Sequence, residues 1–298
     1  LPTNSGKTII AAESIRQMLE IEESRKAVFL APTVALVEQQ TEVLLNHVGG
    51  LDEIRELVCS ALNVSAVPPE VQLAQRFGAD RIALFGYAHV PWMKKHQALI
   101  PENALPDAEE RFRQMSLAAE MLAEAGYESI GIDHFALAGD TLAKATRSGR
   151  LRRNFQGYTD ESADALIGLG ASSISQLPEG YWQNMPATGE YRRMVESGDL
   201  AVVRGVVLQP EDRARAFVIE RIMCAYGFSA CELKARFDAG TDEIIAEAQA
   251  YARENPEVCD YDRFGFRLKN EAFPFARSVA AVFDTYLGRG KGRHSAAV

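Results

Sequence analysis

Cysteine is scarce in this sequence, and long apolar runs and an excess of positive charge are missing. Four cysteines in 298 residues are too few for a disulfide scaffold and are typical of thiols in a reducing cytoplasm, where we expect this protein: Cys59, Cys224, Cys231 and Cys259. No apolar run reaches the about 20 residues that a membrane span needs, and no charged-then-apolar leader opens the chain, so we expect no membrane partner. A net charge of -9 makes nucleic acid an unlikely partner for the chain as a whole, although local basic clusters stay open.

The composition that remains is that of an ordinary globular protein. Hydrophobic residues make up 47% of the chain and charged residues 24%. A chain of this length forms one large domain or two ordinary ones.

The stretch from Leu151 to Ser175 combines charge, one aromatic ring and glycine in a short space. Arg150, Arg152 and Arg153 precede Phe155, a turn is predicted at Gln156-Gly157, and a helix-like run ends near Gly168 and Gly170. Guanidinium groups bind carboxylates in a forked geometry, and an aromatic face takes a flat ring. The stretch therefore favours a site for a ligand with an anionic end, and the alternative is a solvated loop.

Three segments upstream and within this stretch predict strands. The apolar run RIALFGYAH over 81–89 is typical of a parallel strand buried on both faces, ESIGIDHFAL predicts a second strand, and GLGASSIS leads into a third. A helix is predicted between them, from about Asp107 to Ala125. If the strands were parallel, their carboxyl ends would bring four residues to one face: Ala88, His89, His134 and Ile174. The alternative for both histidines is a hydrogen-bonded structural role, and neither has a partner at metal-ligand spacing, so no metal site is predicted.

From about Glu190 the pattern becomes mainly helical. A helix is predicted after Pro210, where acidic residues occupy the first turn, and further helices over 231–239 and 242–255. A small strand pair and a final helix follow.

The first residues have the pattern of a phosphate loop. LPTNSGKT runs directly into a helical pattern, so Gly6, Lys7 and Thr8 are candidates for binding ATP and Mg²⁺. With the strand that follows, residues 1–50 resemble the start of a superfamily 2 helicase, most like the Dicer type. Asn4 stands where that family has glycine, and no acidic box or second motor lobe follows, so nucleotide turnover is not expected.

Most of the remaining chain resembles another family. RRNFQGYT and GLGASSIS, with DRIALFGYAHVPWMKKHQ, AGYESIGIDHFAL and FDTYL, resemble the C-terminal half of oxygen-independent coproporphyrinogen III dehydrogenase, a radical SAM enzyme of haem synthesis. Together the two resemblances imply an α/β fold: a helicase-like phosphate-loop α/β fragment (1–50), then, after a linker that neither family covers (51–79), the C-terminal part of a partial (β/α) barrel of the radical SAM type (80–189) and a small, mainly helical C-terminal domain (190–298).

The same resemblance implies ligands and roles. Ala88 and Phe155 would contact S-adenosylmethionine (SAM), and the backbone of Ile174 would meet its adenine edge. On charge alone, Arg150, Arg152 and Arg153 are candidates for contacting the propionates of a porphyrinogen substrate, and His134 is a further substrate candidate. The reaction of the family is the oxidative decarboxylation of two propionates to vinyl groups.

One part of the family pattern is missing. The CxxxCxxC run that holds the [4Fe-4S] cluster does not occur, so the chain is expected to be inactive alone. Two further hypotheses stay open: an ATP-dependent nucleic-acid motor fragment, and a non-catalytic porphyrin or SAM binder.

Overall fold

The computed structural model describes residues 71, 74–75, 78–92, 95–154 and 157–287. The predictions for Gly6, Lys7 and Thr8, and the one for Phe155, lie outside the described residues. Within that range the chain forms two compact units. The first-half unit holds described residues up to 129 together with 133–140, and the second-half unit holds 130–132 and 141–287. Each unit is described by itself.

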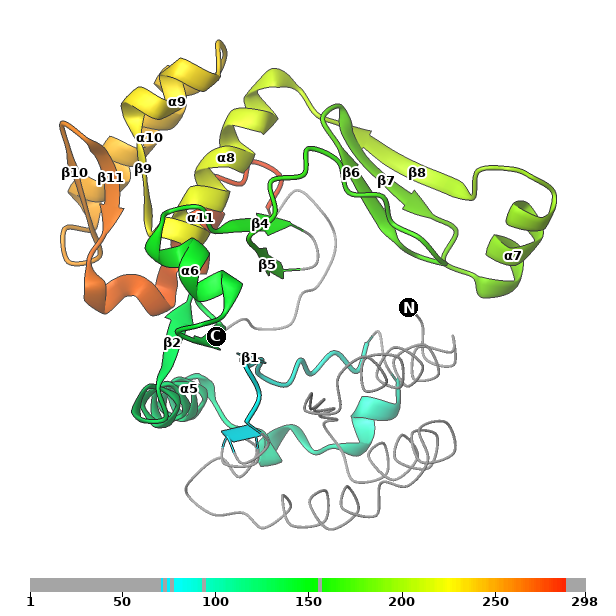
Figure 1. The fold of residues 1–298 in the computed structure, drawn as a ribbon, viewed down its shortest axis with the longest axis horizontal. Helices are drawn as coiled ribbons and strands as arrows, with labels where there is room; N and C mark the ends of the chain where they lie inside the picture. Colours follow the sequence, from blue (N-terminus) through cyan, green and yellow to red (C-terminus); the bar gives the residue numbers. More distant parts are fainter. Residues whose placement is uncertain (1–70, 72–73, 76–77, 93–94, 155–156, 288–298) are drawn as a thin grey trace. The chain divides into compact units, whose positions relative to one another are not determined.

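The first-half unit contains a small sheet and one long helix (Figure 1). Its sheet has the order β1-β3-β2, and β1 pairs antiparallel with β3. Asp107 caps the long helix, since its side chain accepts a hydrogen bond from the backbone N of Glu110 at 2.9 Å. The elements are β1 (Arg81–Ala83), η1 (Lys95–Leu99), η2 (Glu102–Ala104), α5 (Ala108–Glu124), β2 (Tyr127–Ile130) and β3 (His134–Leu137).

The long helix confirms the prediction for 107–125, but the strand predictions around it were wrong in two ways. The strand expected over 81–89 is only β1, which has one buried residue, Ile82, and is antiparallel to its neighbour. The single strand expected in ESIGIDHFAL is two strands, because the chain turns at Gly131, whose φ is +57°. A glycine adopts that left-handed conformation without strain.

The second-half unit opens with a helix, a hairpin and a three-stranded sheet. β4 pairs antiparallel with β5, and β6, β7 and β8 form an antiparallel sheet in that order. Every residue of β8 is exposed. The elements are α6 (Thr141–Arg147), β4 (Arg152–Asn154), β5 (Gly157–Thr159), β6 (Ile174–Leu177), β7 (Gly180–Asn184), α7 (Thr188–Glu196) and β8 (Val202–Val207).

The helix-like run predicted before Gly168 is wrong, whereas the strand predicted after it is β6. Between β5 and β6 the described chain has no helix. Its backbone is used in extended contacts instead: Leu166 bridges to Gln176, and the side chain of Asn184 donates to the carbonyls of Gly168 and Gly170 at 3.1 and 3.0 Å. These bonds hold the glycine-rich segment against the sheet.

The rest of this unit is a compact body of helices around a second sheet, of order β10-β11-β9. Its core contains Ile222, Leu233, Ile244, Phe266 and Phe283. The predicted helices after Pro210 and over 231–239 and 242–255, and the predicted strand pair, are confirmed. The elements are α8 (Pro210–Ala225), β9 (Gly227–Ser229), α9 (Ala230–Arg236), α10 (Thr241–Glu254), β10 (Cys259–Asp262), β11 (Gly265–Leu268), η3 (Asn270–Phe275) and α11 (Ala276–Ala281).

Candidate functional site

The hairpin β4–β5 packs beside α8 and brings charged side chains together. On α8, Glu220, Arg221 and Cys224 are spaced to lie on one face of the helix. Glu220 Oε1 accepts two hydrogen bonds from β4: one from Arg152 Nε at 2.7 Å and one from the backbone N of Arg153 at 3.0 Å. We call these five residues the α8–β4 cluster.

The α8–β4 cluster has more positive than negative charge. It contains three guanidinium groups and one carboxylate, and that carboxylate is already bound to the Arg152 guanidinium. The Nε atoms of Arg153 and Arg221 are both buried and have no hydrogen-bond partner among the described residues. A buried polar group without a partner is uncommon in native proteins and indicates a missing ligand, water or ion.

The thiol of Cys224 is a neutral neighbour in this cluster. Burial, and then the charge of Glu220, raise its pKa to about 12, against the opposing effect of Arg153, Arg221 and Arg152. The thiol is therefore protonated at neutral pH and is a poor nucleophile or metal ligand.

Tyr158 on β5 supports the side chain of Arg153. The guanidinium carbon of Arg153 lies 5.4 Å from the centre of the Tyr158 ring. The Tyr158 hydroxyl donates to the Met223 carbonyl at 3.1 Å and accepts from the backbone N of Ile132 at 3.2 Å. A Cβ at Gly131 would lie 2.1 Å from this ring, so only glycine fits the turn there.

Of the predicted substrate residues, the structure brings two arginines together and leaves the third apart. Arg152 and Arg153 belong to the cluster, whereas Arg150 is exposed and donates to Ser148 Oγ at 3.0 Å. His134 lies in the first-half unit, where its Nδ1 is 2.7 Å from Asp133 Oδ1 and its ring meets Phe85 edge-on.

The four residues expected together at the carboxyl ends of parallel strands do not lie at such ends in the structure. Ile174 and His134 are the first residues of β6 and β3, and Ala88 and His89 lie outside strands. This part of the prediction failed because the described pairings are antiparallel. The Ala88 carbonyl accepts from Gln97 Nε2 at 3.1 Å, and Ile174 lies opposite Gln183.

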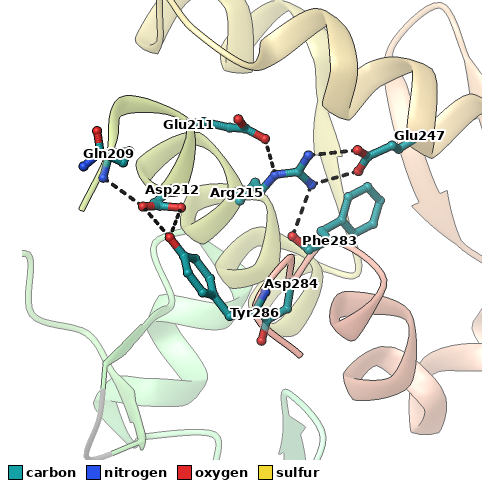
Figure 2. Close-up of polar contacts among 8 residues, drawn as sticks. All are labelled: Gln209, Glu211, Asp212, Arg215, Glu247, Phe283, Asp284 and Tyr286. Carbon is teal, nitrogen blue, oxygen red and sulfur yellow. Dashed lines mark hydrogen bonds and ion pairs between the residues drawn. The ribbon is translucent and has the colours of Figure 1, made fainter. Parts of the chain in front are cut away.

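A second arginine on α8 has a complete set of partners (Figure 2). Arg215 donates to Glu211 at 2.7 Å, to both oxygens of Glu247 at 2.8 Å and to the Phe283 carbonyl at 3.3 Å. Close by, the Tyr286 hydroxyl donates to Asp212, which also accepts from the backbone N of Gln209.

Sequence reasoning missed both Arg215 and Arg221. The spacing of Glu211 and Arg215 was a visible signal, since residues four apart on a helix are neighbours. The FDTYL block carries part of the family resemblance but does not by itself indicate its contacts. Its Phe283 and Tyr286 hold the chain after α11 to α8. Nothing local in the sequence signalled Arg221, because its significance depends on β4.

Comparisons with known proteins cover the two ends of the chain separately. Residues 1–66 match the family model Type III restriction enzyme, res subunit, which fits the helicase-like fragment. Oxygen-independent coproporphyrinogen III oxidase of Paracoccus denitrificans is 43% identical over 232 residues, which are 78% of this chain and 51% of that protein. The same enzyme of Cereibacter sphaeroides is 42% identical, over 75% of this chain and 50% of that protein. The chain thus spans about half the length of these curated relatives.

A solved structure agrees with the sequence relatives. Coproporphyrinogen III oxidase of Escherichia coli, described as a radical SAM enzyme, matches with a TM-score of 0.68 and 26% identity, over 91% of this chain and 62% of that one. The fold is accordingly a mixed α/β fold, similar to that of this radical SAM enzyme. From residue 80 onward the sequence blocks predict this similarity to oxygen-independent coproporphyrinogen III oxidases, and the relatives bear it out.

The iron-sulfur cluster of that class does not fit the described cysteines. Cys224 and Cys259 are buried and Cys231 is exposed, and burial raises the pKa of Cys259 to about 11. Among the described residues no group of three or more metal-ligating side chains occurs. No described helix is long and apolar enough to cross a membrane.

Proposed function

We propose that this chain is the substrate-binding C-terminal half of a coproporphyrinogen III oxidase of the oxygen-independent type. In the whole protein the reaction would be the oxidative decarboxylation of two propionates to vinyl groups, giving protoporphyrinogen IX. The observation that carries the proposal is the α8–β4 cluster. In it, the two arginines of the RRNFQGYT block and Arg221 outnumber the single carboxylate of the cluster, and two of the three have an unbonded Nε. Guanidinium groups are suited to propionate side chains.

The residues of this chain would bind and orient the substrate, and the reaction itself would also need the part of the relatives that this chain does not span. Because the described cysteines do not form a cluster site, we assign no catalytic step to this chain. Ala88, Phe155 and Ile174 stay proposed contacts of SAM. His134, held by Asp133, stays a proposed substrate contact. The partial barrel over 80–189, the helical domain over 190–298 and a cytoplasmic location also stay predictions.

Ligand titration tests this proposal directly. Coproporphyrin III, the air-stable oxidised form of the substrate, is expected to bind the intact chain with a change in porphyrin fluorescence. Its tetramethyl ester, which has no carboxylates, is the matched control and is expected to bind more weakly. Equal binding of acid and ester would contradict a substrate site built on arginine.

The match of the first residues to a restriction-enzyme family favours a second candidate, nucleotide binding. If Gly6, Lys7 and Thr8 form a working phosphate loop, the chain binds ATP with Mg²⁺, and Lys7→Ala abolishes that binding. ATP binding that survives Lys7→Ala would rule this loop out.

A further inference from the structure

The arginines near RRNFQGYT differ in what they bind. Arg150 is exposed and bonded to a serine hydroxyl, and Arg152 is bonded to Glu220. Arg153 lies over Tyr158 with its Nε buried and unbonded among the described residues. A carboxylate that has bound one guanidinium has less capacity for another, so charge alone does not make these residues equivalent.

Arg221, one turn before Cys224 on α8, shares the surroundings of Arg153. Glu220, whose carboxylate accepts from the backbone N of Arg153, precedes Arg221 directly in the sequence, and both guanidinium groups also lower the pKa of the Cys224 thiol electrostatically. Both also have a buried Nε with no partner in the described part of the chain. The Cys224 thiol of the same cluster is neutral, and the Tyr158 ring lies beneath Arg153.

Leaving a buried donor unbonded is costly, because the group has lost water and gained nothing in exchange. The Nε atoms of Arg153 and Arg221 therefore have unused hydrogen-bonding capacity, while both side chains remain partly exposed. A planar carboxylate complements a guanidinium group, with two oxygens for two N–H groups. A group of higher negative charge is less suitable, since Glu220 lies in the same cluster.

We propose that Arg153 and Arg221 together form a carboxylate-binding site, and that its ligand is a propionate side chain of the porphyrinogen. Glu220 holds Arg152 and the backbone of Arg153, so it acts as a positioning residue. This inference rests on the proposed function for the identity of the ligand. It goes further by selecting Arg153 over Arg150 and Arg152, and by adding Arg221 from α8.

Nuclear magnetic resonance can follow the Nε–H groups of Arg153 and Arg221 directly. In a ¹⁵N-labelled sample of the full chain, each arginine Nε–H gives a signal, and Arg153→Lys and Arg221→Lys assign the two signals by their loss. Titration with sodium propionate is expected to shift both signals, and inorganic phosphate less. No shift with propionate, or a larger response to phosphate, would overturn the site.

Porphyrin titration separates the site from the function on which it rests. Arg153→Gln and Arg221→Gln are each expected to weaken coproporphyrin III binding at least about tenfold, because each removes a charge-assisted hydrogen bond. Arg213→Gln, an exposed arginine on the same helix, is the control and is expected to bind as the unchanged chain does. Porphyrin binding that neither substitution weakens overturns the site and leaves the proposed function standing. Propionate shifts without porphyrin binding uphold the site and overturn the proposed function.

Discussion

Helix α8 contributes to two arginine clusters that differ in one respect, the number of partners for each guanidinium. Arg215 is only 6% exposed and has two carboxylates and a carbonyl around it. Arg153 and Arg221, in the α8–β4 cluster, have buried Nε atoms without described partners. The same residue type is thus saturated at one cluster and unsaturated at the other.

The difference separates an arginine that stabilises the fold from arginines available to a ligand. Hydrogen bonds to Glu247 and Glu211 raise the pKa of Arg215 above its ordinary value, although burial opposes them. The charge of Arg215 is therefore paired within the protein. It connects α8 to α10 and to the segment after α11 (Figure 2). Substitutions at the two clusters should therefore change different properties.

Gly131→Ala should have the largest effect, because it acts on the ring that supports Arg153. An alanine Cβ would lie 2.1 Å from the Tyr158 ring, and φ at this position is +57°. We expect the free energy of unfolding to fall by about 3 kcal/mol or more, from overpacking and backbone strain together. Gly149→Ala is the matched control: its φ is +67° but nothing lies within 4 Å, so about 1 kcal/mol is expected. Equal losses in urea unfolding would show that the ring contact does not matter.

Arg215→Ala should have the next largest effect, a loss of about 2–3 kcal/mol in the free energy of unfolding. Removing one partner of a buried ion pair costs about 3–5 kcal/mol, and the value is lower here because Glu247 and Glu211 are partly exposed. Arg213→Ala, at an exposed position of the same helix, should change stability by less than about 0.5 kcal/mol. Thermal or urea unfolding of the three proteins checks the difference. A loss at Arg215 no larger than at Arg213 would show that the saturated cluster contributes nothing.

The Cys224 thiol should make stability depend on alkaline pH. Its pKa in the folded protein is about 12, above the ordinary value of 9.0, so the folded chain keeps a proton that the unfolded chain loses. Its contribution is fully present below pH 9 and is lost as the pH rises towards 12, at up to about 1.4 kcal/mol per pH unit. Urea midpoints of the unchanged chain should therefore fall more steeply from pH 8 to 10 than those of Cys224→Ser. Cys231→Ser, at an exposed thiol, is the control and should leave the slope unchanged.

The two clusters also show what the sequence could predict. Helices α5, α8 and α10 were predictable because their caps, proline position and apolar spacing are local signals. The strand directions were not, because GIDHF contains a turn at Gly131 that depends on Tyr158 and Tyr226, which lie 27 and 95 residues further along the chain. The positive charge of Arg152 and Arg153 was visible in the sequence. The difference in their bonding was not, because Glu220 and Arg221 come near them only through the packing of α8 on β4.

Arg221→Met should have the smallest effect on stability and the clearest effect on binding. Methionine keeps an unbranched apolar stem and removes a buried Nε that has no described partner, so no hydrogen bond from that atom is lost. We expect the free energy of unfolding to stay within about 1 kcal/mol of the unchanged chain, while propionate no longer shifts the Arg153 Nε–H signal. Urea unfolding and the propionate titration measure the two properties on one sample. A loss of stability as large as that of Arg215→Ala would mean that Arg221 is saturated inside the protein as Arg215 is, and the distinction between the two clusters would be wrong.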